Sequence, residues 1–174
     1  MKHGNVLRII LAVIFAITGI YQISNAFSND GHKEIVKETV GINEFAVDKD
    51  NVGFCVTNVD NSKSLGSGYF EVTTDYNYAV VTIEIFNNGV EPYDVNTLRF
   101  VLMNGDTEYE YAAEAIFSLE DSMYLDTINP GISKEYKIPY EIPTSTDDGE
   151  YMLKIKPYAY TDKNCVYIAL KETK

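Results

Sequence analysis

The stretch that decides the fold is YAVVTIEIFNNGVEP, residues 78–92. From residue 81 every second side chain is aliphatic (Val81, Ile83, Ile85), which is the period-2 pattern of a strand with one buried face. The run stops at Asn87-Asn88-Gly89. Because Asn and Gly reach positive φ at the least cost, we expect a turn there that uses this conformation. The rest of the domain should pack short strands against the apolar face of this one.

Short strands are predicted on both sides of this stretch. Residues 112–124 have helical composition without a clear cap, so we expect a loop with one short helical turn there. Residues 61–68, NSKSLGSG, have the composition of a loop. The remaining strands are predicted at 51–59, 98–102, 107–111, 133–142, 151–156 and 166–170. A count of about seven strands without βαβ alternation predicts an all-β, immunoglobulin-like antiparallel β-sandwich.

Individual residues in these strands carry further expectations. Pro139 has no backbone N–H to donate, so its strand should lie at a sheet edge or carry a bulge. Tyr136, Tyr140 and Tyr151 sit at the positions expected to face inward and are predicted to be core residues. Asn129-Pro130-Gly131 is a strong turn signal.

The N-terminal 27 residues are predicted to be a signal peptide or a single-pass membrane anchor. An apolar run from Ile9 to Ile23, which should form a hydrophobic helix, follows the basic residues Lys2 and Arg8. Ser24-Asn25-Ala26 offers small residues for signal-peptidase cleavage, so cleavage and retention both remain open. In either case the charge pattern directs the following domain out of the cytoplasm. Residues 28–41 are expected to form a polar tether, and residues 42–174 the folded domain.

Four segments in fixed order resemble a known family: IEIFNNGVEP, LRFVLMNGDTEYEY, INPGISKEYKIPYEIP and YMLKIKPYA. Together they resemble the telokin-like immunoglobulin-fold family known as domain of unknown function 4352, which is common in exported proteins of Gram-positive bacteria. The resemblance covers roughly Gly41 to Lys171. It implies an extracytoplasmic β-sandwich without established catalytic residues.

Charge and histidine content exclude several classes of function. Beyond residue 29 the chain carries 12 Lys and Arg against 26 Asp and Glu, a net charge of −14, which would repel a phosphate backbone. Nucleic acid is therefore not expected as a partner. The histidines, His3 and His32, both precede the domain, so it has no imidazole for a Ser-His-Asp or Cys-His site or for a His-rich metal site.

Cys55 and Cys165 fall in the first and last predicted strands of the sandwich. In immunoglobulin-like sandwiches the terminal strands often neighbour one another, and export exposes a cysteine pair to oxidising conditions. A disulfide would stabilise the domain by about 4–5 kcal/mol if the geometry allows it. The alternative is a pair of small, unbridged residues packed at strand ends.

Two weaker sites are candidates for binding. Asp121 and Asp126 lie in one acidic loop and Asp147 and Asp148 in another, and carboxylates with backbone carbonyls suit calcium. Neither loop has the spacing of a known calcium motif, so acids in solvated turns are the competing interpretation. Tyrosines near strand ends form a candidate recognition patch, with packing at the sandwich edge as the alternative: Tyr69, Tyr109, Tyr111, Tyr158 and Tyr160.

These observations predict a non-enzymatic binding module, secreted or held at the cell surface by the N-terminal segment, with no cofactor. Its expected partner is a protein or another component of the cell envelope. Two alternatives remain open: a hydrolase that uses carboxylates alone on a cell-wall glycan, and a purely structural envelope domain.

Overall fold

The computed structural model describes residues 39–121, 126–144, 150–157 and 165–171. Contacts within the chain divide it into residues 1–33 and 34–174, and every described residue belongs to the second unit. The predicted N-terminal hydrophobic helix and most of the predicted tether lie outside the described residues. Within the described residues, no helix has the length and hydropathy needed to cross a membrane.

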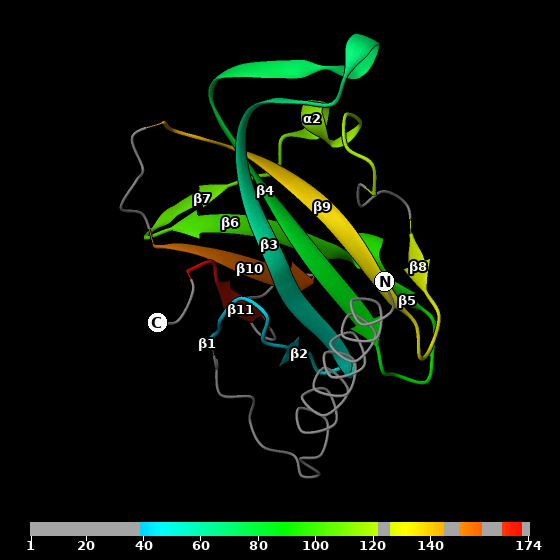
Figure 1. Cartoon of the computed structure of the whole chain (residues 1–174). Helices are drawn as coiled ribbons and strands as arrows, with labels where there is room; N and C mark the ends of the chain where they lie inside the picture. Colours follow the sequence, from blue (N-terminus) through cyan, green and yellow to red (C-terminus); the bar gives the residue numbers. More distant parts are fainter. Residues whose placement is uncertain (1–38, 122–125, 145–149, 158–164, 172–174) are drawn as a thin grey trace, which may run out of the picture. The chain divides into compact units, whose positions relative to one another are not determined.

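The described residues form an all-β, sandwich-like fold with two larger sheets and one small one (Figure 1). One sheet has the order β1 (Thr39–Val40), β11 (Val166–Ala169), β10 (Tyr151–Pro157), β6 (Leu98–Asn104) and β7 (Thr107–Tyr109). The other has the order β2 (Ala46–Val47), β3 (Val52–Leu65), β4 (Val72–Asn87) and β9 (Ser133–Ile142). The small sheet pairs β5 (Tyr93–Asp94) with β8 (Thr127–Ile128), and the helical turns are η1 (Gly68–Phe70), η2 (Val95–Thr97) and α2 (Ala113–Ile116).

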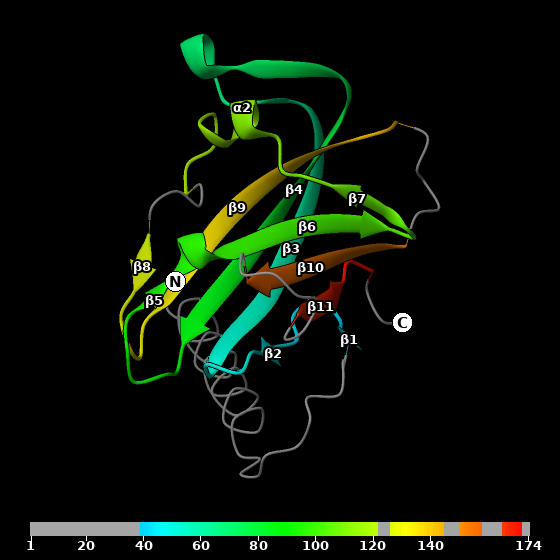
Figure 2. The ribbon, with the colours of Figure 1, turned by 180° about the vertical axis from the view of Figure 1, so that it is seen from behind.

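The main core lies between the two larger sheets, which Figures 1 and 2 show as crossing layers. Val81, Ile83 and Ile85 of β4 are completely buried, which confirms the strand predicted from their alternation. They belong to one hydrophobic cluster with residues of β6 and β10 in the opposite sheet, including Phe100, Leu102, Leu153 and Ile155. Burial of this shared face is what holds the two layers together.

Strand number and strand length differ from the sequence-based expectation. Eleven strands occur among the described residues rather than about seven, and six of them have only two to four residues. Such short pairings carry no measurable periodicity in sequence. The prediction of a loop at residues 61–68 is wrong in its first part, because β3 continues to Leu65 and pairs Ser64 with Thr73 of β4.

The turn after β4 forms by a different mechanism from the one predicted. Neither Asn88 nor Gly89 has a positive φ. Instead the side chain of Asn87 organises the turn, because its Oδ1 accepts a hydrogen bond from Gly89 N at 2.9 Å. The strand after this turn belongs to another sheet, so the turn is a crossover and not a hairpin.

Other expectations are confirmed in part. β9, which carries Pro139, lies at the edge of its sheet. Tyr136 and Tyr140 are buried in the core, whereas Tyr151 is half-buried at its border. The region after Tyr111 holds the short helix α2. The first described residues differ from the expected tether, since β1 at Thr39–Val40 is already part of a sheet through parallel pairing with β11.

Candidate binding surface

The hairpin formed by β3 and β4 extends beyond the sheet to which it belongs. β9 pairs with β4 only from Asn77 onward, so the preceding part of β4 pairs with β3 alone. The extension ends in η1 and lies above α2 in the view of Figure 1. The chain therefore presents the η1 turn at the far end of a long hairpin.

A second hydrophobic cluster lies beneath the extension and is separate from the main core. It consists of Leu65, Tyr78, Val80, Ala112 and Ala115, with Val72 and Leu119 packed against it. The period-2 rule explains its position: Tyr78 and Val80 alternate with Ala79 and Val81 of the main core, so they lie on the opposite face of the sheet. This cluster fastens the α2 segment to the extension.

At Gly66 the extension comes close to the segment after α2. It has φ of +79°, and a Cβ at this position would lie 2.5 Å from Phe70 O and 2.9 Å from Ser118 Cβ. A side chain there would therefore separate the two walls and would also force an unfavourable backbone conformation. Glycine at position 66 allows the turn to fold down onto the chain at Ser118.

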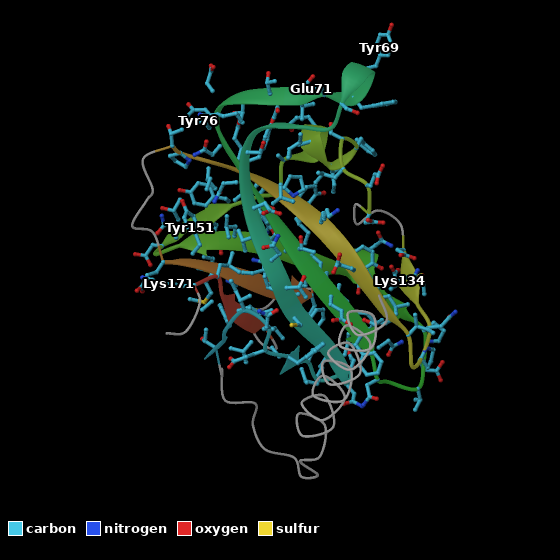
Figure 3. The ribbon with its side chains drawn as sticks, in the orientation of Figure 1. Tyr69, Glu71, Tyr76, Lys134, Tyr151 and Lys171 are labelled. Carbon is cyan, nitrogen blue, oxygen red and sulfur yellow. The ribbon has the colours of Figure 1, made fainter. Side chains whose placement is uncertain are left out.

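An open hollow of about 350 Å³ lies between these two segments. Phe70 is 70% exposed and Phe117 is 64% exposed on its two sides. Tyr69 is fully exposed and projects from the tip in Figure 3. The rest of the lining is Gly66, Ser67, Ser118, Leu119 and Glu120. We call the hollow together with Tyr69, Phe70 and Phe117 the tip surface.

The tip surface carries negative charge. Residues 64–72 and 112–121, which build it, contain Glu71, Glu114, Glu120 and Asp121 and neither Lys nor Arg. Lys63 precedes them, but its Nζ donates to the backbone oxygens of Asp75 and Tyr76 at 3.0 and 2.5 Å. The Nζ of Lys137 lies 4.0 Å from Asp121 Oδ2, a loose ion pair. The carboxylates next to the aromatic rings thus outnumber the nearby cations.

The described members of the predicted tyrosine patch do not lie together. Tyr69 lies at the tip, but Tyr109 and Tyr111 are half-buried and pack against the main core. The ring centroid of Tyr109 lies 6.3 Å from that of Tyr151. Tyr158 and Tyr160 lie outside the described residues. Phe70 and Phe117, which line the hollow, were not predicted from the sequence; the available signal for Phe70 was the aromatic pair directly after Gly68.

Cys55 and Cys165 are both buried, and the structure has no disulfide between them. Cys55 alternates with Phe54 and Val56 of the main core, so its side chain lies on the other face of the sheet. Burial, with Glu84 and Glu44 nearby, raises the pKa of the Cys55 thiol to about 12. A thiol with such a pKa is unreactive at neutral pH. The predicted disulfide stays a prediction.

The predicted calcium ligands are separated into different environments. Asp126 accepts hydrogen bonds from Lys134 Nζ at 2.7 and 2.9 Å and from the Tyr136 hydroxyl at 2.8 Å. Asp121 faces Lys137 as described above, and Asp147 and Asp148 lie outside the described residues. No group of three or more potential metal ligands occurs in the described part of the chain.

Asp48 is a carboxylate with a perturbed pKa, but its surroundings are structural. Burial raises the pKa of Asp48 above its usual value. One of its oxygens accepts hydrogen bonds from the N–H groups of Asp50 and Val52, each at 2.9 Å. The other accepts from the hydroxyl of Tyr93 at 2.9 Å. Asp48 therefore ties the β2–β3 turn to β5, and nothing in this geometry favours an acid/base role.

Comparisons with known proteins identify a family and a fold. The profile of a family described as a domain of unknown function (DUF4352) matches residues 40–165. No curated protein sequence matches the chain. The yjhA protein of Bacillus subtilis has a TM-score of 0.58 and 16% sequence identity, over 76% of this chain and 100% of that one.

Two further solved structures share the fold. MPT63, a secreted protein from Mycobacterium tuberculosis, has a TM-score of 0.55 and 13% identity, over 79% of this chain and 99% of that one. The ycdA protein of Bacillus subtilis, provisionally described as a lipoprotein, has a TM-score of 0.54 and 22% identity, over 71% of this chain. This chain spans only 37% of the ycdA protein. Identities this low establish the shared fold alone.

Proposed function

The chain belongs to the DUF4352 family, and from this membership and the tip surface we propose that it is an extracytoplasmic, non-enzymatic binding module. In this proposal the sandwich is of the telokin-like, immunoglobulin-like type. Residues 1–27 serve as a signal peptide or as a membrane anchor, and a polar tether follows. The partner is a protein or another component of the cell envelope, bound at the tip surface.

An extracytoplasmic location is supported by the composition of the N-terminal segment and by two structural neighbours. The apolar run of residues 9–23 follows positive charge and precedes an acidic domain, which is the arrangement of an exported protein. MPT63 is described as secreted and the ycdA protein provisionally as a lipoprotein. The absence of histidine after residue 32 supports a function without acid/base catalysis by imidazole.

The observation that carries the proposal is the exposure of three aromatic side chains at the tip, two of which, Phe70 and Phe117, line its hollow. Large aromatic side chains usually lose water contact on folding, and exposed clusters of them are typical of interaction sites. Tyr69, Phe70 and Phe117 are all exposed although a hydrophobic cluster immediately beneath them orders the backbone that carries them. A rigid support with exposed aromatic side chains lowers the entropy lost on binding.

Site-specific photo-crosslinking tests the proposal. In the full chain, produced in a Gram-positive host, p-benzoylphenylalanine replaces Tyr69 or Phe117. Val90, an exposed residue in the turn after β4, is replaced in the control. Irradiation of intact cells is expected to yield a discrete adduct from positions 69 and 117 and none from position 90.

Equal adducts from all three positions, or none from the tip, would contradict a binding role for this surface. The same cells are fractionated in parallel, and recovery of the chain in the cytoplasm would contradict the location. Incubation of the purified full chain with isolated cell-wall glycan tests the non-enzymatic part, and release of soluble fragments would overturn it.

A further inference from the structure

We propose that the tip surface binds a polypeptide segment in which basic side chains alternate with apolar ones. The inference rests on the proposed function and adds the chemical class of the partner. It follows from the combination of the aromatic rings, the open hollow and the carboxylates around it.

The apolar part of the partner follows from the hollow. A volume of about 350 Å³ is at the lower end of the range for pockets that enclose a small molecule, and this hollow is open to solvent. Phe70 and Phe117 flank it and Leu119 contributes to its lining. This geometry suits the side chains of an extended polypeptide better than an enclosed ligand.

The basic part of the partner follows from the charges. Glu120 lines the hollow, Glu71 directly follows Phe70, and Asp121 directly follows Glu120. Within the described residues, no Lys or Arg forms an ion pair with Glu71 or Glu120. A Lys or Arg side chain entering here would gain both a carboxylate partner and the face of an aromatic ring.

The same charges disfavour other partners. An acidic protein segment would meet like charge at the tip and also the overall net charge of −12. An anionic lipid surface would be repelled in the same way, although the exposed Tyr69 and Phe70 otherwise resemble an aromatic loop that inserts into an interface. A lipid surface is therefore treated as an alternative outcome of the test.

The test uses the purified full chain in non-ionic detergent and three fluorescent peptides that differ only in charge. Each peptide repeats a tripeptide of Lys-Leu-Gly, Gln-Leu-Gly or Glu-Leu-Gly four times. We expect the Lys peptide to bind about tenfold more tightly than the Gln peptide, and the Glu peptide to bind weakest. Raising the salt concentration from about 0.05 M to about 0.5 M should weaken binding of the Lys peptide and leave binding of the Gln peptide nearly unchanged.

Matched variants assign the binding to the tip surface. Phe117→Ser should weaken binding of the Lys peptide at least about fivefold. Val90→Ser, at another exposed apolar position, should leave this binding unchanged. The double variant Glu71→Gln and Glu120→Gln should reduce binding of the Lys peptide alone, and Glu91→Gln is its control. Because all these side chains are exposed, the variants are expected to keep the wild-type thermal midpoint, which is measured alongside.

The outcomes separate the inference from the proposed function. Equal binding of the three peptides, with Phe117→Ser weakening all of them, overturns the inference and leaves the tip as a binding surface. Failure of the Lys peptide to bind also overturns the inference, and the adducts at positions 69 and 117 then decide the proposed function. Binding to vesicles of phosphatidylcholine and phosphatidylglycerol that is lost in Phe117→Ser, without peptide binding, would replace the peptide partner with a lipid surface.

Discussion

Asn87 shows how much of the fold depends on one buried polar side chain. It is 1% exposed, and its Nδ2 donates to the backbone oxygens of Glu91 and Ile128, both at 2.8 Å. Its Oδ1 accepts from Gly89, and its backbone N–H and C=O bond to Ile132 and Gly131. A single residue thus connects the end of β4, the crossover turn, β8 and the turn before β9.

Replacement of Asn87 should be much more costly than replacement of its neighbour. Asn87→Ala leaves the buried carbonyl of Ile128 without its donor and is expected to lower the free energy of unfolding by about 2–3 kcal/mol. Asn88→Ala keeps the hydrogen bonds between the backbone of residue 88 and Asn51. It should therefore change the free energy of unfolding by less than about 0.5 kcal/mol. Urea unfolding followed by circular dichroism measures both, and equal losses would show that the side-chain bonds of Asn87 contribute nothing.

Sequence and structure agree on Asn87 only in part. The sequence correctly marked residues 87–89 as a turn, because Asn and Gly are turn-forming residues. The sequence does not reveal that Asn87 is buried, since besides its local bonds to Gly89 and Glu91 it satisfies groups from residues 128–132, about forty positions away. Pro139 was predicted more completely, because a missing N–H limits its strand to few positions whatever the partners are.

At the scale of the element, the β3–β4 extension shows why its length was not predicted. Residues 61–68 are polar, which favours a loop when they are considered alone. They are strand residues as far as Leu65 because a partner strand, β4, begins at Val72 on the other side of η1. The alternating apolar strands, by contrast, carry their own signal, and β4, β9 and β10 are found where it predicted them.

The candidate binding site was less predictable than the strands for the same reason. Tyr69 was selected because it lies near a strand end, but Phe117, which shares the tip surface with it, is distant in sequence and belongs to the segment after α2 that packs under the extension. No periodicity relates these two positions. Tyr109 and Tyr111, chosen on the same grounds as Tyr69, pack against the core instead.

Two glycines in the turn of the β3–β4 extension test whether its close contact with the segment after α2 stabilises the tip. Gly66 and Gly68 both have positive φ, but only Gly66 has close neighbours where a Cβ would lie. Gly68→Ala is expected to lower the free energy of unfolding by about 1 kcal/mol, because alanine is unfavourable at a positive φ. Gly66→Ala should cost about 1–3 kcal/mol more, because the added methyl collides with Phe70 and Ser118.

Hydrogen exchange distinguishes local from global effects in these variants. In Gly66→Ala the amides of Phe70 and Ser118, which bond to Ser67 and Ala115, should exchange faster, while those of β6 and β10 are less affected. Identical exchange in both variants would mean that the close approach at Gly66 does not hold the tip against the α2 segment.

At the scale of the whole molecule, the free energy of unfolding should depend on pH through two carboxylates whose pKa values are shifted in opposite directions. The hydrogen bond from Lys134 holds the pKa of Asp126 below its usual 3.8, although burial acts against it. Burial raises the pKa of Asp48 above the same value. Ionised Asp126 therefore contributes stability that is present above pH 3.8 and lost as the pH falls through its folded-state pKa. Ionisation of Asp48 instead removes stability as the pH rises from 3.8 through its raised pKa.

The two Asn variants should consequently show opposite trends. Asp126→Asn is expected to be destabilised at about pH 7 and to approach wild type as the pH falls through the lowered pKa of Asp126. Asp48→Asn should gain stability relative to wild type as the pH rises from about 3 to about 7, since its amide can still bond to Tyr93 and to the N–H groups of Asp50 and Val52. Urea unfolding at several pH values measures both differences. Parallel curves for the two variants would contradict the assignment.

The pairing of β1 with β11 determines when this domain can be completed during its synthesis. Thr39 and Val40 lie beside Tyr167 and Ile168, so one sheet takes its first strand from the start of the domain and the neighbouring strand from the far end of the same domain. A contact between segments so far apart in sequence cannot form early, and it is entropically costly to close. β3 and β4 can meet as soon as the ribosome or an export channel has released them, whereas the edge of the other sheet must wait until the domain is synthesised as far as β11.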